Sequence, residues 1–527
     1  MNRNLEHEPG IRLIERAADH GDRRAILSEG RAFSYADLLR ASETVARVLL
    51  GSTDRVEDLK EERIAYLVQG SFEYAAVQWG VWRSGGLAVP LSASAKEPEL
   101  EHVLTDAAVS RVLVSAGMED RIEGLYDRLG IGSMTVEEAM EGWRGPDTTT
   151  PDPRFPGVDG DPTPDLPNVT ADRRAMMLYT SGTTSKPKGV VTTHANIEAQ
   201  IRALVQAWGW RADDRIPLFL PLHHVHGIVN VLSCALWSGA QVETFPGFDL
   251  DTILRRVGED AYTVFMAVPT IYVKLIAAVE STDQATREFW TEGFRRMRLM
   301  ISGSAALPAA THEKWTALTG QELLERYGMT EIGMGLSNPL EGERRPGAVG
   351  QPLPGVELRL VSEAGEVIEG EDEPGEIQVK GPAVFTEYWN LPSVTAEAFQ
   401  DGWFRTGDMA VLEDGYYRIL GRLSVDIIKS GGYKLSALEI EDVLRQHPRI
   451  QECAVVGVAD DVWGEAVAAA VVTADGEPLG LDDLKAWAGY RLSSYKVPKH
   501  LLGVADFPRN AMGKVMKPAV RALFEAE

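Results

Sequence analysis

The chain has 527 residues, and a single hydrophobic core stops growing at roughly 250 to 300 residues, so we expect at least two domains. Hydrophobic residues make up 44% of the chain and charged residues 25%, a composition that excludes a disordered or fibrous protein. The net charge of −25 repels polyanions, which disfavours nucleic acid as a main partner.

The N-terminus lacks the apolar region of a signal peptide, and no segment reaches the ~18 uninterrupted apolar residues of a membrane span. The two cysteines, Cys234 and Cys453, are too few and too far apart for a disulfide framework or a cysteine-based zinc site. We therefore expect a cytoplasmic protein without a membrane span. Both a monomer and a homodimer fit the sequence.

The first two thirds of the chain alternate between strands and helices. Residues 61–94 contain an apolar run, a helical pattern, a glycine pair and a second apolar run, and similar alternations recur at 213–245 and 261–302. This order predicts βαβ units, and therefore an α/β fold with largely parallel sheets covered by helices. The segment 145–168, rich in Pro, Asp and Thr, is interpreted as a surface loop.

The pattern changes after Pro346 to short extended runs separated by Gly, Asp and Glu, which predicts antiparallel hairpins. A compact α+β unit follows, with a helix opened by a capping box from Ser436 to Glu439. We predict an N-terminal domain of residues 1–421, including a β subdomain at about 346–421, and a C-terminal domain of residues 422–527.

The strongest local signal is TSGTTSKPKG at 180–189. Hydroxyl groups, exposed backbone N–H groups and ammonium ions are the donors that a polyphosphate needs, and glycine lets the backbone approach it closely. The candidate phosphate ligands are Thr180, Ser181, Gly182, Thr183, Thr184 and Lys188. The alternative is a polar surface loop. A Walker A loop is excluded because Pro187 stands at the place of its second glycine.

This loop resembles the signature loop of the adenylate-forming superfamily, which includes the acyl-CoA synthetases. Six further segments resemble motifs of that family in the same order: 221–227, 302–308, 325–331, 403–408, 421–441 and 508–514. The resemblance implies a large N-terminal α/β domain with a β subdomain, followed by a smaller, mobile α+β lid. It also implies a reaction in which ATP activates a carboxylic acid as an acyl-adenylate and coenzyme A then accepts the acyl group.

The resemblance assigns the nucleotide site. The 180–189 loop holds the β and γ phosphates, Thr330 contacts the α phosphate, and Glu331 with Thr183 ligates Mg²⁺. Tyr327 stacks on adenine and Asp408 accepts the ribose hydroxyls. The further nucleotide contacts that it implies are Ser304, Ala305, Glu325, Arg326, Gly328, Met329 and Arg422.

The resemblance also assigns roles in the lid. Lys514 bridges the substrate carboxylate and the α phosphate during adenylation. The lid then rotates about a hinge that normally carries Asp or Lys and here carries Ser424. After rotation, the coenzyme A arm passes the segment Lys429, Ser430, Gly431, Gly432 and Tyr433. His224 gates the path to the acyl group, with a structural histidine as the alternative.

The acid pocket is predicted to include His226, Ser302, Gly303 and Met334. We predict that Arg298 places a guanidinium at the pocket floor and holds a second carboxylate there. The alternative is that Arg298 belongs to an exposed basic helix end. The motifs resemble malonyl-CoA synthetases most, which predicts malonate as the acid and methylmalonate as a second substrate.

Three other functions remain open at this point. The chain could be a CoA ligase for another short-chain, medium-chain or aromatic acid, or an adenylating enzyme that loads a carrier protein. A nucleotide-binding module without catalytic activity is disfavoured, because Lys514, Glu331 and Asp408 are all present.

Overall fold

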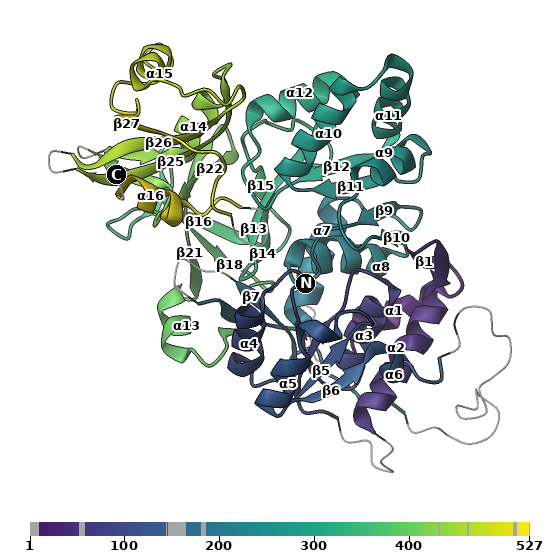
Figure 1. Ribbon diagram of the computed structural model, residues 1–527. Coiled ribbons are helices and arrows are strands. Elements are labelled where there is room, and N and C mark those ends of the chain that lie inside the picture. The colour runs from purple at the N-terminus through teal and green to yellow at the C-terminus, as the bar shows by residue number, and fades with distance from the viewer. Residues whose placement is uncertain are drawn as a thin grey trace.

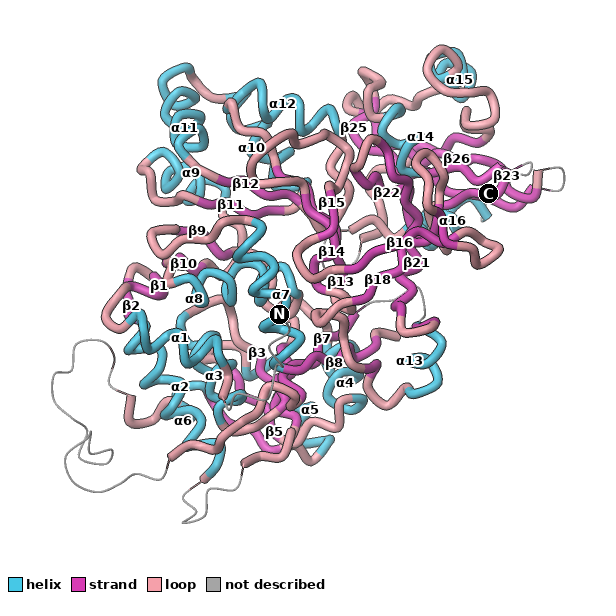
Figure 2. The backbone as a smooth tube through the Cα atoms, turned by 180° about the vertical axis from the view of Figure 1, so that it is seen from behind, coloured by secondary structure: helices cyan, strands magenta, loops and turns pink. Residues whose placement is uncertain are grey.

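The computed structural model describes residues 10–51, 58–143, 145, 165–180, 186–430, 433–460, 463–509 and 514–525. Within these residues the strands form five sheets, three of them in the region where βαβ units are predicted. We call the C-terminal part of the chain, from residue 422 on, the lid, and the part before it the large domain. In Figure 1 the lid lies at the upper left, beside the part of the large domain that carries α10 and α12. Figure 2 shows the same arrangement from behind.

The largest sheet has the strand order β19-β8-β7-β4-β3-β5-β6. The predicted unit at 61–94 is confirmed: β3 (Arg63–Leu67), α3 (Phe72–Arg83) and β4 (Leu87–Pro90) follow one another, and the two strands pair in parallel. Its other strands are β5 (Arg111–Val114), β6 (Gly132–Thr135), β7 (Arg174–Thr180), β8 (Lys188–Thr193) and β19 (Glu387–Tyr388). Strands β7 and β8 form an antiparallel hairpin that carries the candidate phosphate loop.

Two smaller sheets contain the other predicted βαβ units. One has the order β2-β1-β10-β9 and the other β11-β12-β13-β14-β15. The pairs β9 with β10 and β11 with β12 are parallel, which confirms the predictions at 213–245 and 261–302. The strands are β1 (Arg24–Ser28), β2 (Arg31–Ser34), β9 (Arg215–Leu218), β10 (Gln241–Thr244), β11 (Val264–Ala267), β12 (Leu299–Ser302), β13 (Leu324–Met329), β14 (Gly333–Ser337) and β15 (Gln351–Pro352).

Helices cover these sheets (Figure 1). They are α1 (Arg12–His20), α2 (Tyr35–Leu50), α4 (Glu97–Asp106), α5 (Glu123–Leu129), α6 (Val136–Ala139), α7 (His194–Ala207), α8 (Cys234–Ser238), α9 (Leu250–Gly258), α10 (Pro269–Ser281), α11 (Gln284–Arg296) and α12 (Ala309–Thr319), with short 3₁₀ and π segments η1 (Glu119–Arg121) and η2 (His226–Ser233). The side chain of Ser34 caps α2, and that of Thr193 caps α7. None of the described helices is long and apolar enough to cross a bilayer.

The β subdomain is an antiparallel sheet of order β17-β16-β18-β21-β20, with β22 paired to β21, as the short extended runs predict. Its elements are β16 (Glu357–Val361), β17 (Val367–Ile368), β18 (Gly375–Lys380), α13 (Pro392–Ala398), β20 (Phe399–Gln400), β21 (Trp403–Glu413) and β22 (Tyr416–Arg422). Asp408 on β21 lies opposite Arg422 on β22. The register of this hairpin therefore places the predicted ribose ligand, Asp408, beside the last residue of the β subdomain's final strand.

The lid contains β23 (Ile427–Ser430), β24 (Tyr433–Ser436), α14 (Ala437–Leu444), β25 (Ile450–Asp460), β26 (Gly464–Thr473), α15 (Leu481–Ala488), β27 (His500–Gly503) and α16 (Lys517–Glu525). Ser436 accepts a hydrogen bond from the Glu439 amide and caps α14. Alternate residues of β25 and β26 enter two separate apolar clusters, so both faces of the lid sheet are covered. The domain boundary at residues 421 and 422 stays a prediction.

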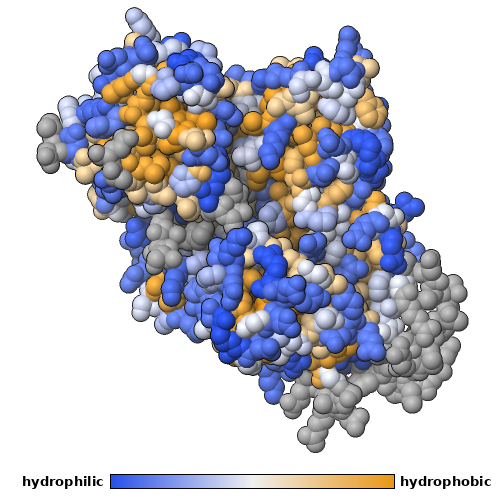
Figure 3. Space-filling model, in the orientation of Figure 1, coloured by the Kyte–Doolittle hydropathy of each residue, from blue (hydrophilic) through white to orange (hydrophobic). Residues whose placement is uncertain are grey.

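Hydrophilic side chains cover most of the face shown in Figure 3, while apolar residues gather on the lid. The surface is hollowed between the lid and the part of the large domain that carries α10 and α12. The predicted loop at 145–168 lies largely outside the described residues.

Candidate active site

Strand β13 divides the site into two halves. Successive side chains of a strand point to opposite faces, so Arg326 and Tyr327 face different surroundings. The Tyr327 hydroxyl reaches Asp408, whereas the Arg326 guanidinium reaches Ser304. The Tyr327 side of the strand is the candidate nucleotide half of the site, and the Arg326 side is the candidate acid half.

The nucleotide half contains a buried carboxylate with two donors. The Tyr327 hydroxyl donates to Asp408 Oδ2 at 2.6 Å, and Arg422 Nε donates to Asp408 Oδ1 at 2.9 Å. Burial, followed by the Asp408 charge, raises the pKa of Tyr327, so its proton stays in place. Burial acts to lower the pKa of Arg422, but the Asp408 carboxylate raises it above its ordinary value. These two donors orient the Asp408 carboxylate, whose remaining lone pairs can accept hydroxyl donors.

A second group connects the phosphate loop to Glu331. Thr180 and Lys188 face each other at the end of the β7–β8 hairpin, and Lys188 Nζ lies 5.3 Å from the ring centre of Tyr388. The Tyr388 hydroxyl in turn donates to Glu331 Oε1 at 3.0 Å. Burial raises the pKa of Glu331. The fold thus brings a phosphate-loop ammonium and the predicted magnesium ligand to the same place.

The candidate acid half contains the buried guanidinium of Arg326 and the hydroxyl of Ser304, two residues that the resemblance assigns to the nucleotide. Arg326 is only 4% exposed, its Nε has no hydrogen-bond partner, and no acidic side chain among the described residues pairs with it. Its NH2 lies 3.4 Å from Ser304 Oγ, and His226 Nδ1 lies 3.1 Å from the same oxygen. A Cβ on Gly303 would lie 2.5 Å from the Arg326 guanidinium carbon, so a side chain at 303 would displace the guanidinium from this position. Ser304 itself adopts the left-handed backbone region at φ 71°, which non-glycine residues adopt at an energetic cost.

The histidines of the 221–227 motif are neutral. Burial lowers the pKa of His224 to about 4, and burial together with the Arg326 charge lowers that of His226 well below its ordinary value. His226 begins the π-helix η2, a rare conformation frequent at functional sites. A Cβ on Gly227 would lie 2.5 Å from the Pro221 carbonyl oxygen, so glycine permits this turn. Neutral imidazoles can orient a substrate without repelling the Arg326 cation.

Gln200 holds the backbone of a predicted pocket residue, but it lies outside all the sequence motifs. Gln200 on α7 accepts a hydrogen bond from the Met334 amide at 2.8 Å through its Oε1. Gly333 has φ 65°, and a Cβ there would lie 1.8 Å from the same oxygen. Because α7 is distant in sequence, this contact between α7 and the predicted pocket residue Met334 appears only in the fold.

The structure describes the surroundings of five other predicted nucleotide contacts, whose role stays a prediction. The carboxylate of Glu325 accepts a hydrogen bond from the Gly347 amide at 3.0 Å, and burial raises its pKa to about 8. Thr330 and Met329 are half-buried at the turn between β13 and β14, and Gly328 packs closely on Gly333. Ala305 is exposed beside Ser304. Predicted residues Ser181, Gly182, Thr183, Thr184, Gly431 and Gly432 lie outside the described residues.

The structure corrects the prediction for Arg298. Its guanidinium donates through Nε and NH2 to the two carboxylate oxygens of Asp214, at 2.7 and 2.5 Å, and through NH1 to the Trp208 carbonyl. Asp214 is 2% exposed. Arg298 precedes β12, whereas Ser302 and Gly303 follow at the carboxyl end of that strand, so they lie at opposite edges of the sheet. Arg298 is a structural ion-pair partner and does not form the pocket floor.

Most of the predicted lid residues that the structure describes lie at the surface, but Ser430 does not. Lys514 is exposed, Lys429 Nζ lies 3.8 Å from Glu363 Oε1, and Ser430 is buried. Tyr433 is 54% exposed and stacks on Tyr495 with ring centres 4.6 Å apart. Elsewhere in the lid, Lys499 Nζ lies 3.8 Å from the ring centre of the half-exposed Trp463. The sequence motifs give no signal for Tyr495, Trp463 or Lys499.

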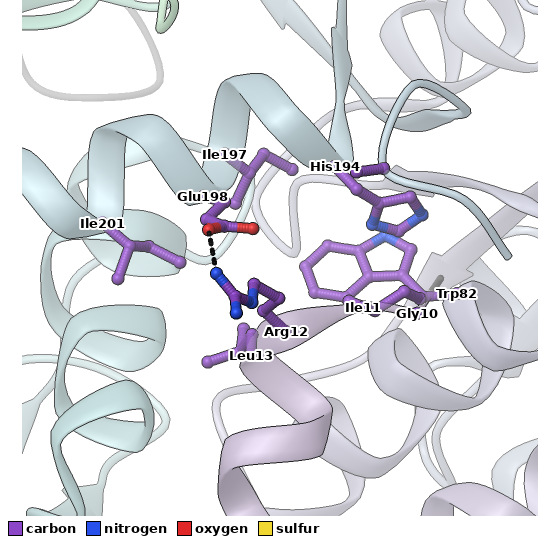
Figure 4. Close-up of a pocket in the computed structure, with 10 residues that line it drawn as sticks. Gly10, Ile11, Arg12, Leu13, Trp82, His194, Ile197, Glu198 and Ile201 are labelled. Carbon is purple, nitrogen blue, oxygen red and sulfur yellow. Dashed lines mark ion pairs between the residues drawn. The ribbon is translucent and has the colours of Figure 1, made fainter. Parts of the chain in front are cut away.

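A small cavity near the N-terminal segment is separate from these groups (Figure 4). It lies between α1, α3 and α7, with His194 and Trp82 on one side and the ion pair Arg12–Glu198, at 3.9 Å, on the other. Burial lowers the pKa of His194 to about 3. The cavity lining joins the first helix to α7 and contains no set of groups suited to catalysis.

Comparison with known proteins identifies the family. The sequence pattern of the AMP-binding enzymes matches residues 13–389, and that of the AMP-binding enzyme C-terminal domain matches residues 439–514. The chain belongs to the AMP-binding enzyme family. Its phosphate loop and its β13 strand therefore belong to the first matched region, and Lys514 ends the second.

Relatives of this AMP-binding enzyme match over nearly their whole length. It is 43% identical to the mitochondrial malonate–CoA ligase of Xenopus laevis, over 98% of this chain and 92% of the relative. It is 40% identical to the malonate–CoA ligase of Arabidopsis thaliana, over 97% and 87%. The structure of ATP-bound MatB from Rhodopseudomonas palustris superimposes with a TM-score of 0.86 at 34% identity, over 98% of this chain and 99% of MatB.

Replacement of Arg298 by Ala should lower stability and leave acid preference unchanged. The variant leaves the Asp214 carboxylate buried without its partner, which costs about 3 kcal/mol. Urea unfolding measures this loss, and kinetics with malonate and acetate measure the preference. A selective loss of malonate activity would restore Arg298 to the acid pocket.

Activity should show no histidine titration near neutral pH. Because the pKa values of His224 and His226 are lowered, both imidazoles are already neutral above about pH 6. We expect kcat/KM for the acid to have no inflection near pH 6.5 when measured from pH 5.5 to 8. An inflection there that disappears in His226→Asn would contradict the neutral assignment.

Proposed function

We propose that this chain is an ATP-dependent malonate–CoA ligase. It converts malonate and ATP to malonyl-adenylate and pyrophosphate, and then transfers the malonyl group to coenzyme A with release of AMP. The names of the relatives support this proposal, and one observation carries it: the buried Arg326 guanidinium lies beside His226 and Ser304 with no acidic partner among the described residues.

The charge of Arg326 explains a preference for a dicarboxylate. A buried charge without a partner costs several kcal/mol, so the pocket is stabilised when an anion enters it. Malonate has two carboxylates, and adenylation consumes the charge of one. The second carboxylate can accept two hydrogen bonds from the guanidinium fork, while Ser304 and neutral His226 supply further polar contacts. Methylmalonate has the same pair of carboxylates and is included as a second substrate.

The nucleotide half orients ATP for attack on its α phosphate. Asp408 accepts the ribose hydroxyls, and Tyr327 and Arg422 keep its carboxylate in place. Thr180 and Lys188 belong to the loop that receives the β and γ phosphates. Because the two faces of β13 are joined by one peptide bond, between Arg326 and Tyr327, the acid and the nucleotide are held at a fixed separation. This positioning lowers the entropic cost of the reaction.

The Glu331 carboxyl suits a hard divalent cation. It is buried, and its hydrogen-bonded neighbour is the Tyr388 hydroxyl, which leaves carboxylate oxygen for a metal. Glu331 would hold Mg²⁺ together with the predicted ligand Thr183. When bound, Mg²⁺ neutralises charge on phosphate oxygens. Lys514 supplies the remaining cation between the attacking carboxylate and the α phosphate.

The thioester step uses the tip of the lid. Lys429, Ser430 and Tyr433 lie at the β23–β24 hairpin, through which the pantetheine arm passes in this proposal. The stacked Tyr433 and Tyr495 expose an aromatic face of the kind on which an adenine ring packs. His224 lines the path of the thiol to the acyl group. The cytoplasmic location stays a prediction, and the vertebrate relatives are named as mitochondrial.

Replacement of Arg326 by Met should remove the preference for malonate. The second carboxylate would then be buried without a cation, so kcat/KM for malonate should fall by about two orders of magnitude, or about 3 kcal/mol. Acetate and propionate lack that charge and should be affected little. Pyrophosphate release across these acids measures the difference. Arg298→Ala is the matched control, because it removes a guanidinium from the structural ion pair. If Arg326→Met lowered activity with all three acids by the same factor, Arg326 would not select the acid.

Replacement of Lys514 by Ala should abolish adenylation and spare thioester formation. The lysine is expected to contact the reacting groups in one lid orientation only. Malonate-dependent exchange of pyrophosphate into ATP measures the first step, and a chase of enzyme-bound malonyl-adenylate with coenzyme A measures the second. Exchange at the wild-type rate would refute the role of Lys514.

A further inference from the structure

The hinge of this chain carries an uncharged side chain. Ser424 is exposed between the last strand of the β subdomain, which ends at Arg422, and the first strand of the lid, which begins at Ile427. A serine hydroxyl provides no ionic contact that would favour one lid orientation over another. The energy that fixes the lid must therefore come from residues beside Ser424.

Asp426 closes a turn around Ser424. Its Oδ2 accepts a hydrogen bond from the Arg422 amide at 3.0 Å, and its own amide donates to the Arg422 carbonyl at 2.8 Å. Both bonds span the hinge residue, so a rotation about the φ and ψ angles of Ser424 must break them. A Cβ on Gly421 would lie 2.3 Å from Asp426 Cβ, so the turn also requires glycine at 421.

Lys517 holds the Asp426 carboxylate from the lid side. Its Nζ lies 2.6 Å from Asp426 Oδ1 and 2.8 Å from Glu441 Oε1, and the three side chains are 12%, 16% and 4% exposed, respectively. Burial acts to raise the pKa of Asp426, but the charge of Lys517, with a smaller contribution from Lys514, holds it below its ordinary value. Asp426 is therefore ionised when it accepts the Arg422 amide.

The contacts continue from the hinge into the nucleotide site. The same Arg422 whose backbone is held by Asp426 places its guanidinium on Asp408, which also accepts the Tyr327 hydroxyl. Lys517 follows Lys514 by three residues, and the Met516 amide bonds to the Pro508 carbonyl. A continuous series of polar contacts thus runs from the base of the Lys514 segment through the hinge to the ribose carboxylate.

We propose that Asp426, fixed by Lys517, is the hinge clamp of this chain: a positioning residue that favours the adenylating orientation of the lid. In the structure the clamp is closed, and Tyr433 at the end of the β23–β24 hairpin is 54% exposed. In the proposed reaction the thioester step requires the lid to rotate about Ser424, and therefore an open clamp. This inference rests on the two-step reaction proposed above.

Two variants and one control test the clamp. Asp426→Ala removes the hydrogen bond to Arg422, and Lys517→Met removes the cation that fixes Asp426. Lys496→Met is the control, because Lys496 forms a lid ion pair with Glu439, at 2.5 Å, that does not contact the hinge. Malonate-dependent pyrophosphate exchange and the coenzyme A chase of bound malonyl-adenylate are measured for each full-length variant.

Loss of a hydrogen bond to a charged group shifts an equilibrium by about tenfold or more. We expect the ratio of exchange rate to chase rate to fall by about that factor in Asp426→Ala and in Lys517→Met, and to stay at the wild-type value in Lys496→Met. An unchanged ratio in Asp426→Ala, including an equal loss of both steps through damage to the lid, would overturn the clamp.

A readout without malonate separates this inference from the proposed function. Trypsin cleavage after Arg422, followed by mass spectrometry of the C-terminal fragment, reports opening of the hinge turn. We expect faster cleavage in Asp426→Ala and wild-type cleavage in Lys496→Met. Absence of malonate-dependent exchange in the wild-type enzyme would refute the proposed function, whereas unchanged cleavage in Asp426→Ala would refute the clamp.

Discussion

The buried guanidinium of Arg326 is the constraint on which the proposed acid site depends. Burial lowers its pKa to about 10, which still leaves it charged at neutral pH, and no acidic side chain among the described residues neutralises it. Folding thus places a cation where burial is costly, and an anionic ligand would offset that cost. Gly303 gives it space, and the neutral state of His226 avoids a second positive charge.

The alternation of side chains along β13 places the Arg326 charge and the nucleotide half on opposite faces of the same strand. Tyr327, the next residue, belongs to the nucleotide half through Asp408, and the turn that follows carries Glu331 to the phosphate-loop side. In the proposed function, a carboxylic acid at Arg326 and a ribose at Asp408 are therefore positioned by one strand. The lid is connected to the same strand through Arg422, so its orientation and the nucleotide contact are physically coupled.

The fold could be predicted well from the sequence because its signals are local. Apolar runs, helical periodicity and glycine turns predict the βαβ units, and the capping serine of α14 is visible in the sequence. The prediction for Arg298 failed because closeness in sequence to Ser302 says nothing about which edge of the sheet an arginine occupies. Its partner Asp214 is 84 positions away and comes together with it only in the folded chain. Gln200 and Tyr495 were missed for the same reason.

A crystal structure with a stable analogue of malonyl-adenylate tests the central claim most directly. The account predicts that the free carboxylate of the malonyl group lies within about 3 Å of the Arg326 guanidinium nitrogens, a distance typical of charge-assisted hydrogen bonds. The ribose hydroxyls should lie on Asp408 across β13. A free carboxylate that points to solvent, or that is held by another cation while Arg326 has no anionic partner, would contradict the account.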